Sequence, residues 1–398
     1  MAASTLTTAA HIFKIKYSDK QVQEVAMREH PTFTRIAKEG GFSGVTHNYA
    51  IDYSFPQGVS GTFADAQSGA TDGAGVQLAM YRKAKFGVIT LNGEAMAACE
   101  SNGAFYDLLT KRTDRILAEM GDSFAFDLFR SGNGQRGQRS SASTNVITLT
   151  NANDVRNFKV GMTVIASANA DGSSPRTGST TVAGIDPAAG TITLTSAAAI
   201  TSFANSDYLF RKGDPGTCME GFEVLTPLTA PTGGDSHRGI NRSVDVEGLA
   251  GVRINDTGAG IVQNLGLLAV RANMRGKKLK EGVLNPLNFW TVSQLLGAKV
   301  QYDGGGGTAE VGFEYIVINT PGVSMKVYSD PDCPVDRGRA FDPSTHCLKH
   351  LKELPHIIRD GTGQVAMRST SEDGIEIRAR GWVNYKQEDT AAHGVIAI

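Results

Sequence analysis

The stretch around which the chain can be arranged is GAFYDLLTKRTDRILAEMGDSFAFDLFR, Gly103 to Arg130. Its apolar residues recur every three or four positions, the spacing that lines one face of an α-helix. At about 1.5 Å per residue, the stretch predicts a helix roughly 40 Å long. Charged residues of both signs occupy the other positions, so we expect one lightly buried face and one face that meets water or a partner. No catalytic side chain stands out on it, which indicates a scaffold.

The composition limits the classes of function. The chain has 398 residues, enough for two or three units with a sizeable core. Its 39 basic and 40 acidic residues leave a net charge of −1, which argues against a module that grips duplex DNA through phosphate contacts. Four scattered cysteines without a CxxC pair favour a reducing compartment. There is no signal core and no membrane-spanning run, so we expect cytoplasmic synthesis and no membrane partner.

The first part of the chain predicts an arm and a hairpin. Residues 1–17 have no clear pattern of helix or strand, which indicates an arm. Val45–Phe55 and Val76–Leu91 are strand-like in composition, and they flank the small, polar, glycine-rich segment Pro56–Gly75. This pattern predicts a projecting β-hairpin. Such a hairpin buries little against its own domain, so its order should depend on a neighbour.

An internal repeat marks residues 143–212. Ile147–Ala166 and Ile192–Arg211 align without gaps, and they share ITLT, an alanine and a phenylalanine at equivalent positions. Each copy predicts two strands joined by a connection that carries the phenylalanine, with Thr180–Ile185 as a further strand. We predict a small inserted β-barrel or sandwich, preceded by a flexible crossing at 132–142. Chance similarity between two Thr-rich strands is the alternative.

The remainder returns to a mixed α/β pattern. Gly260–Lys278 has helical spacing, and so does Leu284–Lys299, which carries Pro286 in its first turn. The last long segment, GIEIRARGWVNYKQED from Gly374 to Asp389, alternates apolar with charged residues, as a half-buried strand does. We predict that it returns to close the sheet begun by the first strands.

In this order, the parts resemble the major capsid protein of tailed bacteriophages, the Hong Kong 97-type fold. The resemblance rests on SFPQGVSGTFADA, YRKAKFGVITLNGEAM, the long helix, NPLNFW, SDPDCPVDRGRAFDPST and EIRARGWVNY. It covers most of the chain outside residues 143–212. It implies an α+β fold with an N-terminal arm (1–53), an extended loop (54–91), a peripheral domain (92–142, with a spine helix at 103–130, and 365–398) and an apical domain (213–364). The β-rich insertion is absent from the minimal fold.

The resemblance also implies what the chain does. Such a protein is not an enzyme and needs no cofactor; its hexamers and pentamers form an icosahedral head around double-stranded DNA in the virion. Separate scaffolding, portal and decoration proteins are possible partners. We expect inter-subunit contacts at Phe55, Phe63, Arg82, Lys83, Lys85 and Phe86. An encapsulin-type nanocompartment, with protein cargo, shares the fold. A secreted adhesin or a β-rich hydrolase is the alternative from another class.

Two groups of side chains suggest chemistry, and each has a simpler interpretation. Zinc favours two close pairs of ligands, and only Cys347 and His350 form one within the group Cys333, His346, Cys347, His350 and His356. Ordinary packing of these side chains is the simpler explanation of the group, so we predict no metal site. Some relatives join subunits through a lysine and an asparagine, which requires a desolvated, uncharged lysine. For Lys83 and Lys85, a simpler interpretation than such a cross-link is a charged arm that forms ion pairs with acidic residues of a neighbour.

Overall fold

The computed structural model describes residues 30–42, 44–71, 73, 75–94, 102–196, 202–296, 315–320, 322–352, 354–359, 365–369 and 373–398, with backbone only for 102–110 and Leu296. The chain divides into two compact units. The first combines the residues up to Phe126 with Leu225–Ile398, and the second is Asp127–Val224. Most of the predicted N-terminal arm, residues 1–29, lies outside the described residues.

The first sheet of the first unit is built on the long C-terminal strand. Strand β21 (Gly374–Gln387) pairs antiparallel with β4 (Lys83–Asn92) over ten residues. Its other edge pairs with β18 (His346–His350), β19 (His356–Ile357) and β20 (Ala366–Arg368), and β1 (Ala37–Glu39) extends β18 in parallel. The predicted return of the C-terminal strand is therefore confirmed, but β21 joins β4 and not the hairpin.

The hairpin consists of β2 (Thr46–Asp52) and β3 (Gly75–Tyr81), which pair antiparallel. The second extended run is thus two strands, with a break at Arg82, and only β3 belongs to the hairpin. Between β2 and β3 lies a short helix, α4 (Phe63–Ser68), which the sequence did not predict. The Thr62 side chain caps it by accepting the backbone N–H of Asp65. The base of the hairpin is buried with Phe42, Tyr49, Leu78, Met80, Ile240 and Leu249.

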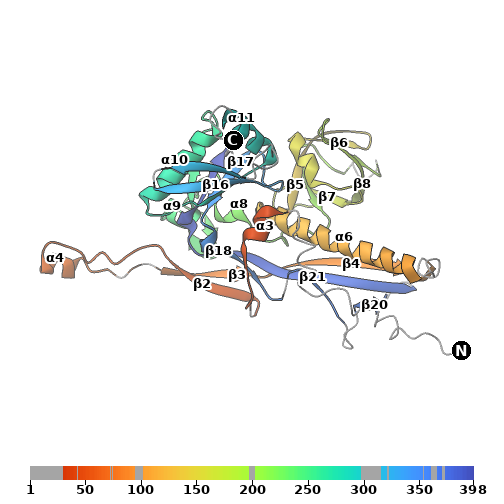
Figure 1. The fold of residues 1–398 in the computed structure, drawn as a ribbon, viewed down its shortest axis with the longest axis horizontal. Coiled ribbons are helices and arrows are strands. Elements are labelled where there is room, and N and C mark those ends of the chain that lie inside the picture. Colours follow the sequence, from red (N-terminus) through yellow and green to blue (C-terminus); the bar gives the residue numbers. More distant parts are fainter. Residues whose placement is uncertain are drawn as a thin grey trace, which may run out of the picture. The chain divides into compact units, whose positions relative to one another are not determined.

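The long helix forms within two residues of its predicted ends, as α6 (Asn102–Leu128). Figure 1 shows it running alongside β4 and β21. The expectation of light burial is wrong for its last turns, because Ser123 and Phe126 are buried as well as the predicted Phe124. The reason is that α3 (Pro31–Arg35) covers this end from another side: Phe33 stacks on Phe124 with ring centroids 6.3 Å apart.

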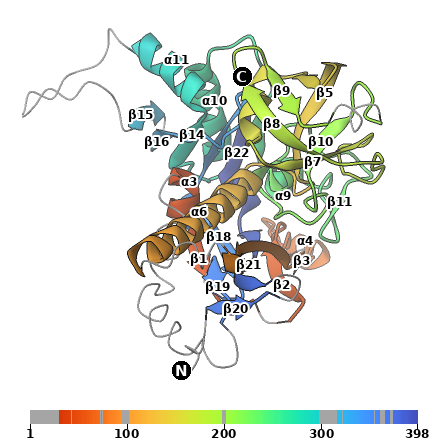
Figure 2. The same ribbon diagram turned by 90° about the vertical axis from the view of Figure 1, so that its right-hand side faces the viewer.

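The second sheet of this unit has the strand order β13-β22-β17-β14-β16-β15. Figure 2 labels four of these strands, β22, β14, β16 and β15. The strands of this sheet are Val252–Ile254, His393–Ala397, Arg337–Phe341, Glu281–Leu284, Val323–Ser329 and Tyr315–Thr320, in that order. Helices α10 (Ile261–Met274) and α11 (Pro286–Leu296) pack on it. Both helices were predicted, and α10 buries Leu265, Leu268 and Ala272 as expected.

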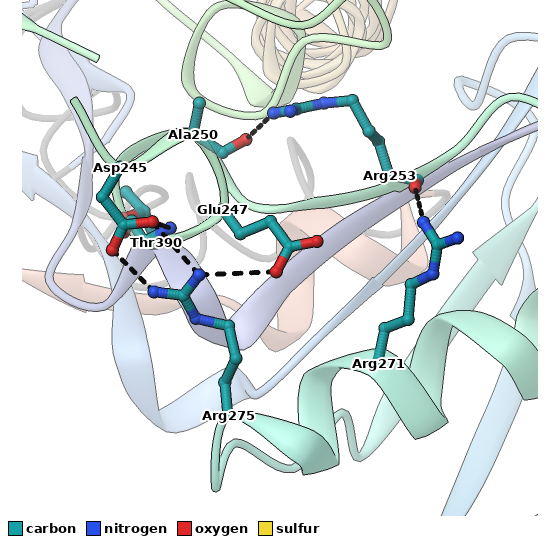
Figure 3. A network of polar contacts seen from close by, with 8 residues as sticks. Asp245, Glu247, Ala250, Arg253, Arg271, Arg275 and Thr390 are labelled. Carbon is teal, nitrogen blue, oxygen red and sulfur yellow. Dashed lines mark hydrogen bonds and ion pairs between the residues drawn. The ribbon is translucent and has the colours of Figure 1, made fainter. Parts of the chain in front are cut away.

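A polar network holds the short helix α9 (Val246–Ala250) against the end of α10 (Figure 3). Asp245 caps α9 and also accepts from Arg275, with Nη2 to Oδ2 at 2.6 Å. The same guanidinium donates to Glu247 at 3.4 Å. Thr390 donates to the carbonyl of Gly248. The network thereby joins α9 both to α10 and to the segment before β22.

The second unit is a closed barrel with the strand order β10-β5-β6-β9-β8-β7. Its strands β5 to β10 are Gln135–Ser143, Val146–Leu149, Thr163–Ser167, Thr180–Asp186, Thr191–Leu194 and Tyr208–Arg211. The shared phenylalanines of the repeat, Phe158 and Phe203, both lie in its core. The predicted flexible crossing is wrong from Gln135 onward, because these residues form β5 and complete the barrel.

The barrel has an internal two-fold symmetry. Ile147 and Ile192 are equivalent in the repeat, and they pair with each other across β6 and β9. Ile165 and Phe210 do the same across β7 and β10. The β5–β6 and β8–β9 hairpins also share one register shift at equivalent places. The repeat therefore includes β5 and β8, and chance similarity between two strands would not produce these matched pairings. The predicted boundaries 143–212 remain a prediction.

The close approach of α6 to the first sheet is testable at Gly381. A Cβ there would lie 2.7 Å from both Phe124 Cζ and Leu354 Cδ1, which are buried and have no room to move. We expect Gly381→Ala to lower the free energy of unfolding by about 1–3 kcal/mol, measured by urea denaturation. Gly40→Ala is the control, since its nearest neighbour is 3.9 Å away. Equal midpoints for the two variants would contradict the packing described.

Candidate inter-subunit surfaces

The tip of the hairpin exposes large apolar side chains. Phe55, Val59 and Phe63 are 82%, 89% and 82% exposed, and we call them the tip patch. The segment 53–62 that contains two of them carries no charged residue. Helix α4, which carries the third, buries none of its residues. Apolar side chains so exposed and so close together are typical of a contact surface.

The tip patch lies far from the body of its own unit. Strands β2 and β3 have seven residues each, so they extend about 23 Å at roughly 3.3 Å per residue. Figure 1 shows α4 at the far end of the hairpin from β4 and β21. Among the described residues of the first unit, none buries the tip patch.

The structure separates the six predicted contact residues into two groups. Phe55 and Phe63 lie on the tip, whereas Arg82, Lys83, Lys85 and Phe86 lie at or beyond the break after β3, on the body. Arg82 donates to the carbonyl of Gly44 at 3.0 Å. Lys85 Nζ donates to Ser123 Oγ on α6 at 2.8 Å. The ammonium of Lys85 thus contacts its own chain, and it lies away from the tip.

Strand β4 presents a second apolar surface, the β4 patch, made of Phe86 and Val88. These side chains are 66% and 53% exposed, while Gly87, Ile89 and Leu91 alternate with them and are buried. No residue on the outward face, from Ala84 to Asn92 in steps of two, is charged. Among the described residues β4 pairs only with β21, so its other edge is open. Exposed edges usually carry charges, prolines or bulges that prevent pairing.

A third apolar surface, the α11 patch, was not predicted. Leu287, Trp290 and Leu295 are 43%, 65% and 65% exposed, and they lie on one side of α11. The helix has no charged residue anywhere along its length. That absence was the available signal in the sequence, but helical spacing alone does not show which apolar residues the sheet leaves uncovered. In the described residues, no helix is long and apolar enough to span a membrane.

The Cys/His group is dispersed. The thiol of Cys333 contacts the carbonyls of Val283 and Arg337, whereas His346 bonds to the hydroxyl of Tyr385 at 2.8 Å. Burial, with a smaller effect of nearby charge, raises the pKa of Cys347 to about 12. A cysteine that binds zinc must be a thiolate, so this raised pKa disfavours Cys347 as a ligand. Over the described ranges, no three His, Cys, Asp or Glu side chains come together as metal ligands.

His30, the first described residue, forms a charged cluster that the sequence did not reveal. Its Nδ1 lies 2.6 Å from Asp332 Oδ2, and its Nε2 lies 2.7 Å from Asp122 Oδ1. Burial alone would lower the pKa of His30, but the two carboxylates outweigh it and raise the pKa to about 10. The imidazole is therefore charged at neutral pH. The partners are 92 and 302 residues away in sequence, beyond the reach of local patterns.

The comparisons with known proteins support a fold. No protein-family profile and no curated protein matches the sequence. A chain of the solved cyanophage A-1(L) capsid asymmetric unit is similar in structure. The match covers 93% of this chain and 92% of the cyanophage chain, with 10% sequence identity and a TM-score of 0.55. The capsid of an empty GTA particle covers 92% and 89%, with 10% identity and a TM-score of 0.49. A chain of Mycobacterium phage Ogopogo covers 93% and 92%, with 11% identity and a TM-score of 0.45. The chain has a mixed α+β fold like that of a phage major capsid protein.

The charge on His30 predicts a pH dependence of stability. The pKa is about 10 in the folded state against an ordinary value of 6.5, so the contribution is complete below about pH 6.5 and is lost as the pH rises toward 10. We expect the wild type to lose about 2 kcal/mol more than His30→Gln between pH 7 and 10, an amount reduced because Asp122 is partly exposed. Urea denaturation at each pH measures it.

His47→Gln is the control for this experiment. Burial lowers the pKa of His47, so its proton is lost below pH 6.5 and its contribution is constant between pH 7 and 10. Parallel curves for the wild type and His30→Gln over that range would mean that the imidazole carries no charge in the folded protein.

Proposed function

We propose that this chain, which has the fold of a phage major capsid protein, is a shell subunit whose hexamers and pentamers form an icosahedral head around double-stranded DNA. The observation that carries the proposal is the tip patch, a group of exposed apolar side chains at the end of an arm that no described residue of the first unit buries. A soluble monomer gains nothing from such an arm. A second copy that accepts the tip would explain both its exposure and its distance from the body.

The β4 patch is the receiving surface in this proposal. Neither patch contains a charged residue, and Asp65 is the one ionisable side chain on α4, so their contact desolvates few ionised groups. Burying a phenylalanine contributes about 1.5–3 kcal/mol, so the three tip side chains together supply roughly 5–9 kcal/mol before the cost of association. Each copy offers one tip and one β4 patch, so the contact is head-to-tail and can close into rings.

The remaining surfaces and segments fit the same proposal. Segments 92–142 and 365–398 would form the peripheral domain, 213–364 the apical domain, 143–212 an insertion and 1–53 the arm. The break at Arg82 favours an extended loop that ends there, with β4 in the peripheral domain. The α11 patch would meet neighbouring apical domains at the capsomer centre. No step requires a cofactor or catalysis.

The near-neutral charge is compatible with enclosed DNA. A shell that bound phosphates strongly would hinder DNA that has to move during filling and release, and 39 basic against 40 acidic residues give little net attraction. Assembly would take place in the host cytoplasm, with a scaffolding protein, a portal and a decoration protein as candidate partners. In this proposal contact with DNA is weak and independent of sequence.

The proposal is tested by placing charges on the tip. We expect Phe55→Asp/Phe63→Asp to lower the yield of particles at least tenfold, because two buried carboxylates would face an apolar surface. Sedimentation and electron microscopy of the purified protein measure this. The urea midpoint should stay at the wild-type value, because neither side chain is buried in its own chain. That separates assembly from folding.

Val160→Asp is the matched control. Val160 is 64% exposed on the barrel and lies outside the three patches, so particles should form as in the wild type. If Phe55→Asp/Phe63→Asp assembled with wild-type yield, the tip would not be a contact and the proposal would fail. If the wild-type chain remained a monomer at every concentration, it would fail as well.

A further inference from the structure

The two sheets of the first unit are joined by two covalent crossovers. Asp342–Thr345 connects β17 to β18, and Glu388–Ala392 connects β21 to β22. The backbone N–H of Asp342 donates to the carbonyl of Ala392 at 3.0 Å, and that of Glu388 donates to the carbonyl of Thr345 at 2.8 Å. The crossovers therefore lie side by side along one line. A pair of adjacent links at the ends of strands has the form of a hinge.

The segment 30–39, which we call the brace, also links the two sheets, through non-covalent contacts. Its C-terminal end belongs to the first sheet, because β1 pairs in parallel with residues 347–349 of β18. The ion pair between Glu39 and Lys349, at 2.6 Å, strengthens this end.

The other half of the brace contacts the second sheet and the turn that follows β16. The guanidinium of Arg35 lies 3.4 Å from the centre of the Tyr328 ring on β16. The backbone N–H of Thr32 donates to the carboxylate of Asp330 at 3.0 Å. His30 pairs with Asp332, two residues further along, at 2.6 Å.

The brace also packs on the end of α6. Phe33 is fully buried against Phe124, and His30 reaches Asp122 at 2.7 Å. Ten residues thus contact the first sheet, the second sheet and the long helix. Apart from the chain itself, all of these contacts are non-covalent and reversible.

We propose that residues 30–39 are a releasable brace that sets the angle between the two sheets, with His30 as its catch. The imidazole contacts two carboxylates, Asp122 from α6 and Asp332 from the turn after β16. A third carboxylate, Asp330, interacts with Asp332 and accepts from the backbone N–H of Thr32. Without the charge on His30, these carboxylates would repel one another in a largely buried place. Release at this end would loosen the contacts of Thr32 and Arg35 in turn. The sheets would then be joined by the crossovers and the contacts beside them, such as His346 with Phe341 and His393.

The inference does not depend on the proposed function, and it gives the N-terminal arm a mechanical role. A partner that pulls on the chain before His30 would act on the angle between the two sheets through this catch. The same holds for a partner that neutralises Asp122, which is the more exposed of the two carboxylates that pair with His30.

Hydrogen–deuterium exchange of the full-length protein tests the brace. In His30→Gln, we expect amides at both crossovers, Asp342 and Glu388, to exchange at least tenfold faster than in the wild type, together with residues 37–39. The pairing of β14 with β16, which lies within the second sheet, should keep its wild-type rates. If faster exchange is confined to residues 30–34, the cluster is a local anchor and the proposal is overturned.

Two further variants keep the result interpretable. Asp332→Asn retains His30 and its pair with Asp122, so it should give the same pattern if His30→Gln does not fold. Arg242→Gln removes a comparably buried ion pair, Arg242 to Asp235 at 2.7 Å, that does not join the two sheets. It should leave exchange at the crossovers unchanged. Faster exchange there in Arg242→Gln would assign the effect to general loss of stability and overturn the brace.

Discussion

The ladder between β4 and β21 is the contact on which the rest of the first unit depends. It joins residues nearly 290 positions apart in the chain and fixes the break at Arg82, the base of the hairpin and the surface on which α6 lies. Glycine at 87 and 381 lets the helix approach the sheet closely, since a Cβ at either position would collide with α6 side chains, Ile116 and Met120 in one case and Phe124 in the other. With the helix and the ladder in place, one face of this sheet is complete.

The opposite face of β4 carries apolar side chains that the described residues leave exposed. Antiparallel sheets commonly cover one face with apolar residues and leave polar residues on the other. Here the outward residues of β4 include Phe86 and Val88, and the strand's second edge is open among the described residues. The hairpin shows the same property at its tip. Exposed apolar surfaces of this kind commonly mark interaction sites.

The barrel differs from the hairpin and β4 because its strands close on one another. Its two halves pair equivalent residues with each other, and closing the ring of six strands leaves no open edge within it. Its core, which includes Phe158 and Phe203, is built from its own residues alone. A unit of this kind buries its own apolar residues, whereas the hairpin tip and the outward face of β4 leave theirs exposed among the described residues.

Local periodicity in the sequence determined α6, α10, α11 and the apolar alternation of β21, because each depends on residues a few positions apart. The repeat was visible for the same reason, although β5 was missed because its Gly- and Ser-rich sequence has little strand character. Only the tertiary structure decided that Lys85 bonds to Ser123 on α6, that Phe33 packs on the end of α6, and that His30 lies between Asp122 and Asp332. These features depend on side chains brought together from distant parts of the chain, and the pairing of β4 with β21 and the docking of residues 30–39 place them there.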